Sequence, residues 1–154
     1  MKPTLALFDL DHTLWDFETN AKDTLNDLYQ IHELNKRGIE DFEGFFNSYS
    51  YHNERLWDRY TKGFIKQDEL RWKRMWLTLL DYKLADEDLS RTMAVQFLET
   101  LPSKKAIFPY TFEILEYLKA KISSNHRNIH MQVASNTFLY LQSYNNTSDK
   151  GYNF

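Results

Sequence analysis

Two aspartates lie two positions apart, directly after a short apolar segment near the start of the chain. Leu5–Phe8 is an uninterrupted apolar run that ends at Asp9 and Asp11, a pattern typical of a parallel strand buried on both faces. Carboxylates at the carboxyl end of such a strand lie where α/β folds bind their ligands. An Asp-x-Asp pair is also a common turn sequence, so this spacing alone leaves a ligand site and a simple turn both open.

The residues around this pair resemble the first motif of the haloacid dehalogenase (HAD) superfamily. In that motif a hydrophobic strand runs into Asp-x-Asp-x-Thr, and residues 8–14 here read Phe-Asp-Leu-Asp-His-Thr-Leu. The extension Trp15–Glu18 and a long helical insert are similar to the branch of small bacterial 5′-nucleotidases that act on pyrimidine nucleoside monophosphates. Pro109, and a second strand that runs into Ser135 and Asn136, lie where the superfamily has its second motif.

The resemblance implies a role for each of these residues. Asp9 would be the nucleophile that forms an aspartyl-phosphate, and Asp11 would be the general acid and base. Mg²⁺ would be held by the Asp9 carboxylate and the Asp11 backbone carbonyl. Ser135 and Asn136 would bind the phosphoryl oxygens and order their loop, and Thr13 would support the first motif.

The second aspartate separates branches within the superfamily. True haloacid dehalogenases resemble this chain in their helical insert but lack an acid at the position of Asp11, because a halide leaving group needs no proton. The resemblance therefore implies a magnesium-dependent phosphatase, a 5′-nucleotidase that hydrolyses a nucleoside monophosphate. A helical insert directly after the first motif also implies a cap that closes over the site and excludes water.

The chain departs from the family after the second motif. A complete member has a later lysine that neutralises charge and a later acidic motif that completes the metal site, and neither Lys150 nor Asp149 matches them. The sequence is therefore interpreted as a member truncated after the second motif, with weak or no turnover. Two other hypotheses stay open: a non-catalytic remnant whose helical block serves interaction or dimerisation, and a small protein that binds a metal or phosphate without turnover.

Apolar spacing predicts the elements that position these residues. Helical periodicity predicts four amphipathic helices within residues 17–101 and a fifth after Pro109, and Ile129–Ala134 reads as a second strand. The order of strand, helices and strand implies parallel strands. The aromatic stripe at 42–60 is interpreted as core, and Arg71, Lys73 and Arg74 as a solvated helix face.

The predicted fold class is therefore α/β, a HAD-like Rossmannoid parallel sheet of which only the first strands are present, with an inserted α-helical bundle cap. Residues 1–16 and 102–154 form the partial core of this prediction, and residues 17–101 form the cap. One edge of the central strand is left uncovered in this arrangement. Self-association through that sheet edge is an expected consequence.

Composition excludes several other classes of protein. The 154 residues include no Cys, which rules out disulfide scaffolds, thiol nucleophiles and Cys-based zinc sites. Nineteen basic and 22 acidic side chains give a net charge of −3, so no nucleic-acid partner is expected. The apolar run before Asp9 is too short for a signal peptide or a membrane span, which predicts a cytoplasmic protein with a small phosphorylated metabolite as its partner.

Overall fold

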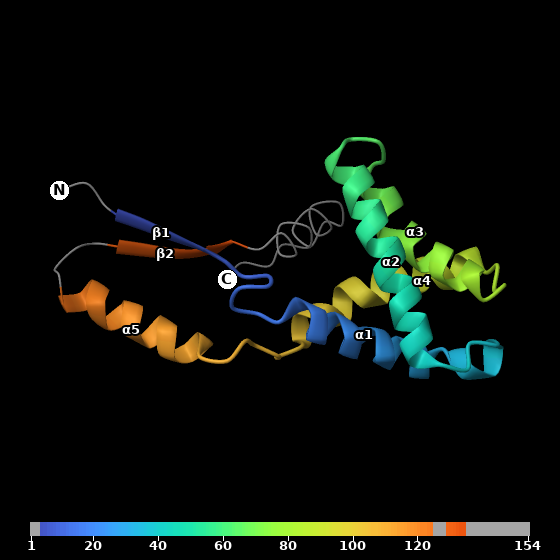
Figure 1. The fold of residues 1–154 in the computed structure, drawn as a ribbon, viewed down its shortest axis with the longest axis horizontal. Helices are drawn as coiled ribbons and strands as arrows, with labels where there is room; N and C mark the ends of the chain where they lie inside the picture. Colours follow the sequence, from blue (N-terminus) through green and yellow to red (C-terminus); the bar gives the residue numbers. More distant parts are fainter. Residues whose placement is uncertain (1–3, 125–128, 135–154) are drawn as a thin grey trace. The chain divides into compact units, whose positions relative to one another are not determined.

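The computed structural model describes residues 4–124 and 129–134. Helices dominate this part of the chain, and the two strands lie at its ends in the sequence (Figure 1). No helix among the described residues is long and apolar enough to cross a lipid bilayer. In chain order the elements are β1 (Thr4–Asp9), α1 (Phe17–Ile31), the 3-10 helix η1 (Leu34–Arg37), α2 (Phe42–Thr61), α3 (Gln67–Asp81), α4 (Glu87–Thr100), the 3-10 helix η2 (Leu101–Ser103), α5 (Thr111–Ser124) and β2 (Ile129–Ala134).

The chain divides into two compact units. The first, here called the strand unit, consists of residues 1–20 and 105–154, and the second, the helical unit, consists of residues 21–104. Helix α1 begins in the strand unit and continues into the helical unit. That these units act as a catalytic core and a cap stays a prediction.

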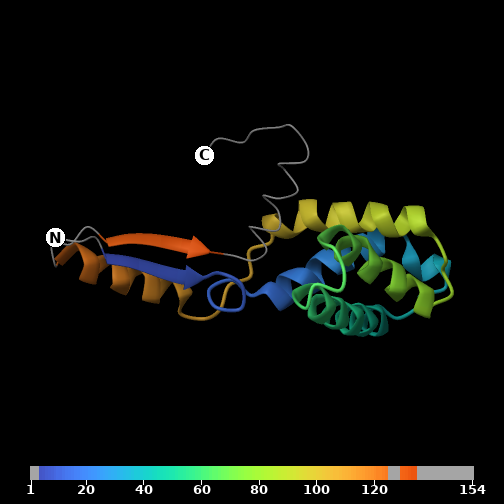
Figure 2. The same ribbon diagram turned by 90° about the horizontal axis from the view of Figure 1, so that it is seen from above.

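The strand unit contains one parallel pair of strands. β1 and β2 run from Thr4 opposite Ile129 to Asp9 opposite Ala134. Parallel strands need a crossover connection, and α5, which precedes β2, lies along the strand pair in both views (Figure 1, Figure 2). Both strands therefore end at the same edge of the sheet, and Asp9 is the last residue of β1 there.

The predicted fold class is corrected by this architecture. A HAD-like Rossmannoid α/β domain was expected, but the described residues are predominantly helical, with five α-helices and two 3-10 helices against two six-residue strands. One strand pair does not form the helix-covered sheet layer of an α/β domain. The physical reason is that apolar residues at helical spacing fill most of residues 17–124, whereas strand-like segments are few and short.

The helical unit is built on the amphipathic helices that the periodicity predicts. The four helices expected within residues 17–101 are confirmed as α1 to α4. Two of these helices begin at a capping aspartate: at the start of α2 the Asp41 carboxylate accepts from the backbone N–H groups of Glu43 and Gly44, and at the start of α4 that of Asp86 accepts from Leu89 N–H. Helix α3 packs against both α2 and α4, and Figure 2 shows the helices of this unit gathered into one bundle.

The aromatic stripe of α2 is buried in the core of this unit at Phe45 and Tyr49, which confirms the prediction for these two rings, whereas Phe42, Phe46, Trp57 and Tyr60 are half-buried. Phe45 is fully buried and Tyr49 is 3% exposed. The Phe45 ring centroid is 5.9 Å from that of Tyr29 on α1, and the Tyr49 ring is 5.8 Å from that of Phe97 on α4. These rings tie three helices together through apolar burial and edge or tilted ring contacts.

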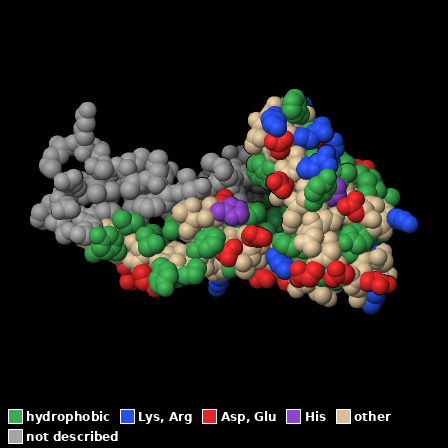
Figure 3. Space-filling view, viewed as in Figure 1, with side chains coloured by type: hydrophobic (Ala, Val, Ile, Leu, Met, Phe, Trp, Pro, Cys, Tyr) green, Lys and Arg blue, Asp and Glu red, His purple; other side chains and the backbone are tan. Residues whose placement is uncertain are grey.

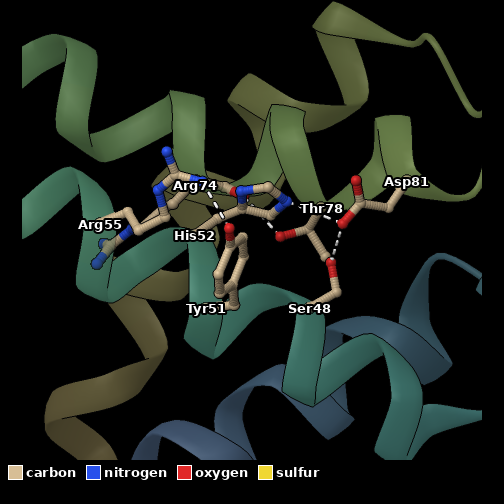
Figure 4. Close-up of polar contacts among 7 residues, drawn as sticks. All are labelled: Ser48, Tyr51, His52, Arg55, Arg74, Thr78 and Asp81. Atoms are coloured by element: carbon tan, nitrogen blue, oxygen red, sulfur yellow. Dashed lines mark hydrogen bonds and ion pairs between the residues drawn. The ribbon is translucent and has the colours of Figure 1, made fainter.

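The prediction of a solvated basic face on α3 is wrong for Arg74. This side chain is 2% exposed and its Nη1 donates to Asn53 Oδ1 at 3.0 Å, and Figure 4 shows it on α3. Its guanidinium lies 5.1 Å from the Phe97 ring and 5.8 Å from the Tyr49 ring. Arg74 follows Leu70 by four positions and therefore shares its buried helix face, where aromatic rings surround the cation.

Helix α5 exposes a large apolar surface. Figure 3 shows hydrophobic side chains gathered over this part of the strand unit. Because isolated apolar residues are normal on a surface but clusters are not, α5 differs in this respect from the helices of the helical unit. The exposed members are Phe112, Ile114 and Tyr117 on α5 and, in the segment just before it, Ile107 and Tyr110.

Candidate functional site

The candidate site begins where β1 ends. Asp9 is the last residue of the strand and is in register with Ala134, the last residue of β2. In the sequence Ala134 is followed directly by Ser135 and Asn136. These two predicted phosphate-binding residues lie outside the described residues, so their role stays a prediction.

A compact turn follows β1 and carries the second aspartate. The Leu10 carbonyl accepts hydrogen bonds from the N–H groups of Thr13 (3.4 Å), Leu14 (3.0 Å) and Trp15 (2.9 Å). His12 N–H in turn donates to the Trp15 carbonyl at 3.1 Å. Such a turn demands an unusual backbone, and His12 adopts a left-handed conformation with φ 59°. The turn therefore brings Asp9, Asp11 and Thr13 together in one short segment.

The turn buries Asp11 and exposes its neighbours. Asp11 is 9% exposed, whereas His12 and Thr13 lie on the surface. The His12 ring centroid is 5.3 Å from that of Phe17, so this histidine packs against the first residue of α1. A carboxylate is rarely buried unless it is paired or has a chemical task, so Asp11 is the best-placed acid or base of the described residues in this turn.

The segment after α4 supports the turn from outside. The Leu14 carbonyl accepts from Phe108 N–H at 3.2 Å and from the Thr111 hydroxyl at 3.1 Å. Trp15 and Ile107 form an antiparallel bridge. The end of the turn is therefore held by the backbone N–H of Phe108 and by the buried side chain of Thr111.

Two more side chains connect the turn to α1. The Asp16 carboxylate accepts from Thr19 N–H at 3.0 Å and from the Thr19 hydroxyl at 2.8 Å, as a helix N-cap does. The buried carboxamide of Asn20 bonds to both backbone groups of Ala106. The Asp-x-x-Thr spacing before an apolar helix is a readable cap signal, whereas nothing in the sequence around Asn20 or Thr111 indicates their partners.

Hard oxygen donors are the metal-binding groups that this segment offers. Carboxylate and carbonyl oxygens of Asp9 and Asp11 suit Mg²⁺, which keeps several waters and needs few protein ligands. The described residues contain no group of three or more His, Cys, Asp or Glu side chains that could hold a metal ion. In donor type the segment fits a hard cation.

Comparison with known proteins finds a similar fold among solved structures. No protein-family model matches the sequence, and no curated protein sequence matches it significantly. Among solved structures, the chain is similar to YfnB from Bacillus subtilis, described as a HAD-hydrolase and crystallised in an orthorhombic form bound to magnesium that reveals interdomain movement. The TM-score is 0.70 at 17% identity, over 95% of this chain and 60% of that one.

The two chains therefore share a fold, and this chain spans 60% of the length of the YfnB chain. The shared fold covers nearly all of the chain, although the sequences differ at most positions. At 17% identity the similarity concerns the course of the backbone. This similarity does not concern reactive side chains, so the chemistry of this chain is inferred from the residues of the turn after β1.

Proposed function

We propose that this chain is a phosphohydrolase of the HAD type that works through an aspartyl-phosphate on Asp9. The observation that carries the proposal is the turn after β1, which buries Asp11 two residues beyond the strand end at Asp9. The fold shared with a HAD-hydrolase supports it. So does the match of residues 8–14 to the first motif of that superfamily.

The chemistry divides between the two aspartates. A carboxylate oxygen of Asp9 attacks phosphorus, and the bond from phosphorus to the ester oxygen of the substrate breaks. Asp11 gives its proton to that leaving oxygen and then takes a proton from the water that attacks the aspartyl-phosphate. Inorganic phosphate leaves, and both aspartates return to their starting protonation states.

The Asp9 carboxylate and the phosphate are both negatively charged, and their repulsion opposes this attack. Mg²⁺ bound by Asp9 and the Asp11 carbonyl would supply the screening that lets the two anions meet. The protein's own contribution is to hold the turn. Hydrogen bonds from residues 13–15 to the Leu10 carbonyl keep Asp11 at a fixed place relative to the strand end.

The substrate class that we propose is a pyrimidine nucleoside 5′-monophosphate. Its support is the resemblance of Trp15–Glu18 and of the helical insert to small bacterial 5′-nucleotidases. The four helices of the insert supply the surface from which such selectivity would come. Many substrates carry a phosphate group, so the assignment of a pyrimidine nucleotide depends on the helical unit.

Phosphate release from uridine monophosphate and from p-nitrophenyl phosphate, with and without Mg²⁺, tests the proposal. Because the sequence departs from the family after the second motif, we expect weak turnover, which needs Mg²⁺ and falls by at least about 10²-fold in both Asp9→Asn and Asp11→Asn. Asp23→Asn, an exposed aspartate on α1, is the matched control and should keep the wild-type rate. Turnover that survives Asp9→Asn would refute the aspartyl-phosphate route, and preference for the aryl phosphate over the nucleotide would refute the substrate class.

A further inference from the structure

The Asn20 side chain makes a backbone-like pair with a residue far along the chain. Its Nδ2 donates to the Ala106 carbonyl at 2.8 Å, and its Oδ1 accepts from Ala106 N–H at 2.9 Å. Nδ2 also donates to the Asp16 carbonyl at 2.8 Å. The side chain is 1% exposed, so both amide hydrogens and the amide oxygen are satisfied inside the protein.

The hydrogen-bonded pair of Asn20 and Ala106 lies where the chain passes between the two units. The chain passes from the strand unit to the helical unit after Asn20 and returns after Lys104. Asn20 and Ala106 belong to the strand unit, and Asp16 N–H donates to the same Ala106 carbonyl at 3.1 Å. The carboxamide therefore joins the outgoing and the returning segments within the strand unit.

The same segments hold the turn that carries Asp11. Residues 14 and 15 are bound to Phe108, Thr111 and Ile107, which follow Ala106 by one to five positions. If the segment that starts at Ala106 shifts, the Leu14 carbonyl loses its donors and the turn loses its outer support. A buried amide that loses its partners leaves several polar groups unpaired, which favours rearrangement of the loop.

We infer that Asn20 is a positioning residue for the Asp11 turn. Its carboxamide holds Ala106 against the start of α1, and the residues that follow Ala106 support the turn. The inference concerns the same site as the proposed phosphatase and rests on that function for its catalytic consequence. Its structural consequence, local ordering of residues 10–16, can be measured without any turnover.

Amide hydrogen exchange of the full chain tests the structural consequence. In Asn20→Ala we expect exchange in residues 10–16 and 104–108 to accelerate by about tenfold or more, because two tertiary hydrogen bonds and their burial are lost. Exchange in α2 and α3 should change less than about twofold. Asn26→Ala, an exposed asparagine on the same helix, is the matched control. Acceleration spread evenly over all helices would mean a merely structural role and would overturn the inference, as would no acceleration in residues 10–16.

Asn20→Asp separates loss of the amide from loss of volume. At neutral pH its carboxylate cannot donate to the carbonyls of Asp16 and Ala106, so it should match Asn20→Ala. Protonation in mild acid restores one donor, and the protection factors of residues 10–16 should then recover toward those of the wild type at the same pH. Absence of any recovery would overturn the role assigned to the donated hydrogen bonds.

Thr111→Val removes a different support of the same turn without removing volume. The valine cannot donate to the Leu14 carbonyl, so exchange should accelerate in residues 10–16 and stay unchanged in α2 and α3. If Asn20→Ala fails to fold, this variant and Asn20→Asp in mild acid carry the test. Unchanged exchange of the turn in Thr111→Val would contradict the inferred dependence on residues 104–111.

Kinetics distinguish the inference from the proposed function. If the wild type turns over p-nitrophenyl phosphate, Asn20→Ala should lower kcat by about 10–10²-fold with KM changed less than about twofold, since misplacement of a reacting group costs rate more than binding. Accelerated loop exchange with an unchanged kcat would overturn the positioning role. If the wild type has no turnover at all, the proposed function fails, and exchange alone decides whether Asn20 orders the turn.

Discussion

The carboxylate of Asp81, at the end of α3, lies 2.8 Å from the imidazole Nε2 of His52 on α2 (Figure 4). The Ser48 hydroxyl, one turn before His52, donates to the same carboxylate oxygen at 2.6 Å. Burial on its own would raise the pKa of the Asp81 carboxyl. The hydrogen bonds from Ser48 and His52, and the attraction of the His52 ring, outweigh it and hold that pKa below its ordinary value. The two helices are therefore joined more firmly when Asp81 is ionised.

The first prediction is a pH-dependent contribution of Asp81 to stability. A carboxyl whose pKa is depressed in the folded state stabilises the protein above the unfolded pKa of about 3.9 and loses that contribution as the pH falls through the folded pKa. The Asp81 side chain is 50% exposed, so solvent screening reduces its contribution to about 0.5–1 kcal/mol. Urea unfolding of Asp81→Asn should show this loss at pH 7, and the difference from the wild type should shrink as the pH falls below about 3.9.

The control for Asp81 is an exposed ion pair of similar chemistry. Asp58 pairs with Lys62 at 2.8 Å within α2, and both side chains are 58% exposed. Asp58→Asn should therefore cost less than Asp81→Asn at pH 7, because a solvated i,i+4 pair contributes only a few tenths of a kcal/mol. An equal cost of Asp81→Asn at pH 3 and pH 7 would show that the carboxylate charge has no part in joining α2 to α3.

The sequence predicts those parts of the site whose interacting residues lie close together in the chain, and it does not predict those whose residues lie far apart. Asp9, Asp11 and Thr13 can be proposed from the sequence because they lie within five consecutive residues at the end of an apolar strand. Asn20 bonds to a residue 86 positions away, and Thr111 to one 97 positions away. No local pattern encodes such pairs, since an asparagine inside a helix ordinarily reads as a solvent-facing residue.

The helices were predictable and the fold class was not, for related reasons. Helical periodicity of the residues that include Phe45 and Phe97 is a local property, and the structure follows it. A sheet is made by segments far apart in the chain, and its size cannot be read from one apolar run such as Leu5–Phe8. The charge of Arg74 predicts a solvent-facing side chain, but its helical spacing from Leu70 places it on the buried face of α3.

The second prediction concerns the aromatic core of the helical unit. Phe45 is fully buried between α1 and α2 near the Tyr29 ring, so Phe45→Ala should lower the free energy of unfolding by about 3–5 kcal/mol through lost burial and a residual cavity. Phe64, in the α2–α3 turn, is 71% exposed, and Phe64→Ala should change it by no more than about 0.5 kcal/mol. Urea denaturation followed by circular dichroism measures the free energy of unfolding of both variants. Similar losses for Phe45→Ala and Phe64→Ala would contradict the placement of Phe45 in the core.

The third prediction concerns the backbone at Gly38. This residue ends the 3-10 helix η1 with φ 95°, and its N–H donates to the Leu34 carbonyl. A Cβ added there would meet no atom within 4 Å, so backbone strain alone decides the outcome. Gly38→Ala should destabilise the helical unit by about 1 kcal/mol.

Asparagine at the same position provides the matched comparison. Asn tolerates left-handed backbone better than Ala does, so Gly38→Asn should cost less than Gly38→Ala in the same thermal unfolding experiment. If steric conflict and not backbone strain set the cost, Gly38→Asn would destabilise the protein more than Gly38→Ala, because Asn is the larger residue. The ranking of the two variants therefore tests the conformation of Gly38 directly.

The last prediction compares the two units. The helical unit buries a continuous apolar core that includes Phe45, Met75 and Phe97, whereas β1 pairs with a single strand, β2, within the described residues. Two-stranded sheets are marginal without further packing, and local opening is easiest where few apolar contacts must break. Amides of residues 45–56 in α2 should therefore exchange more slowly than those of residues 5–8 in β1 when both are measured in one native-state experiment. Longer protection of the β1 amides would mean that the strand unit, and not the helical unit, is the most stable part of this protein.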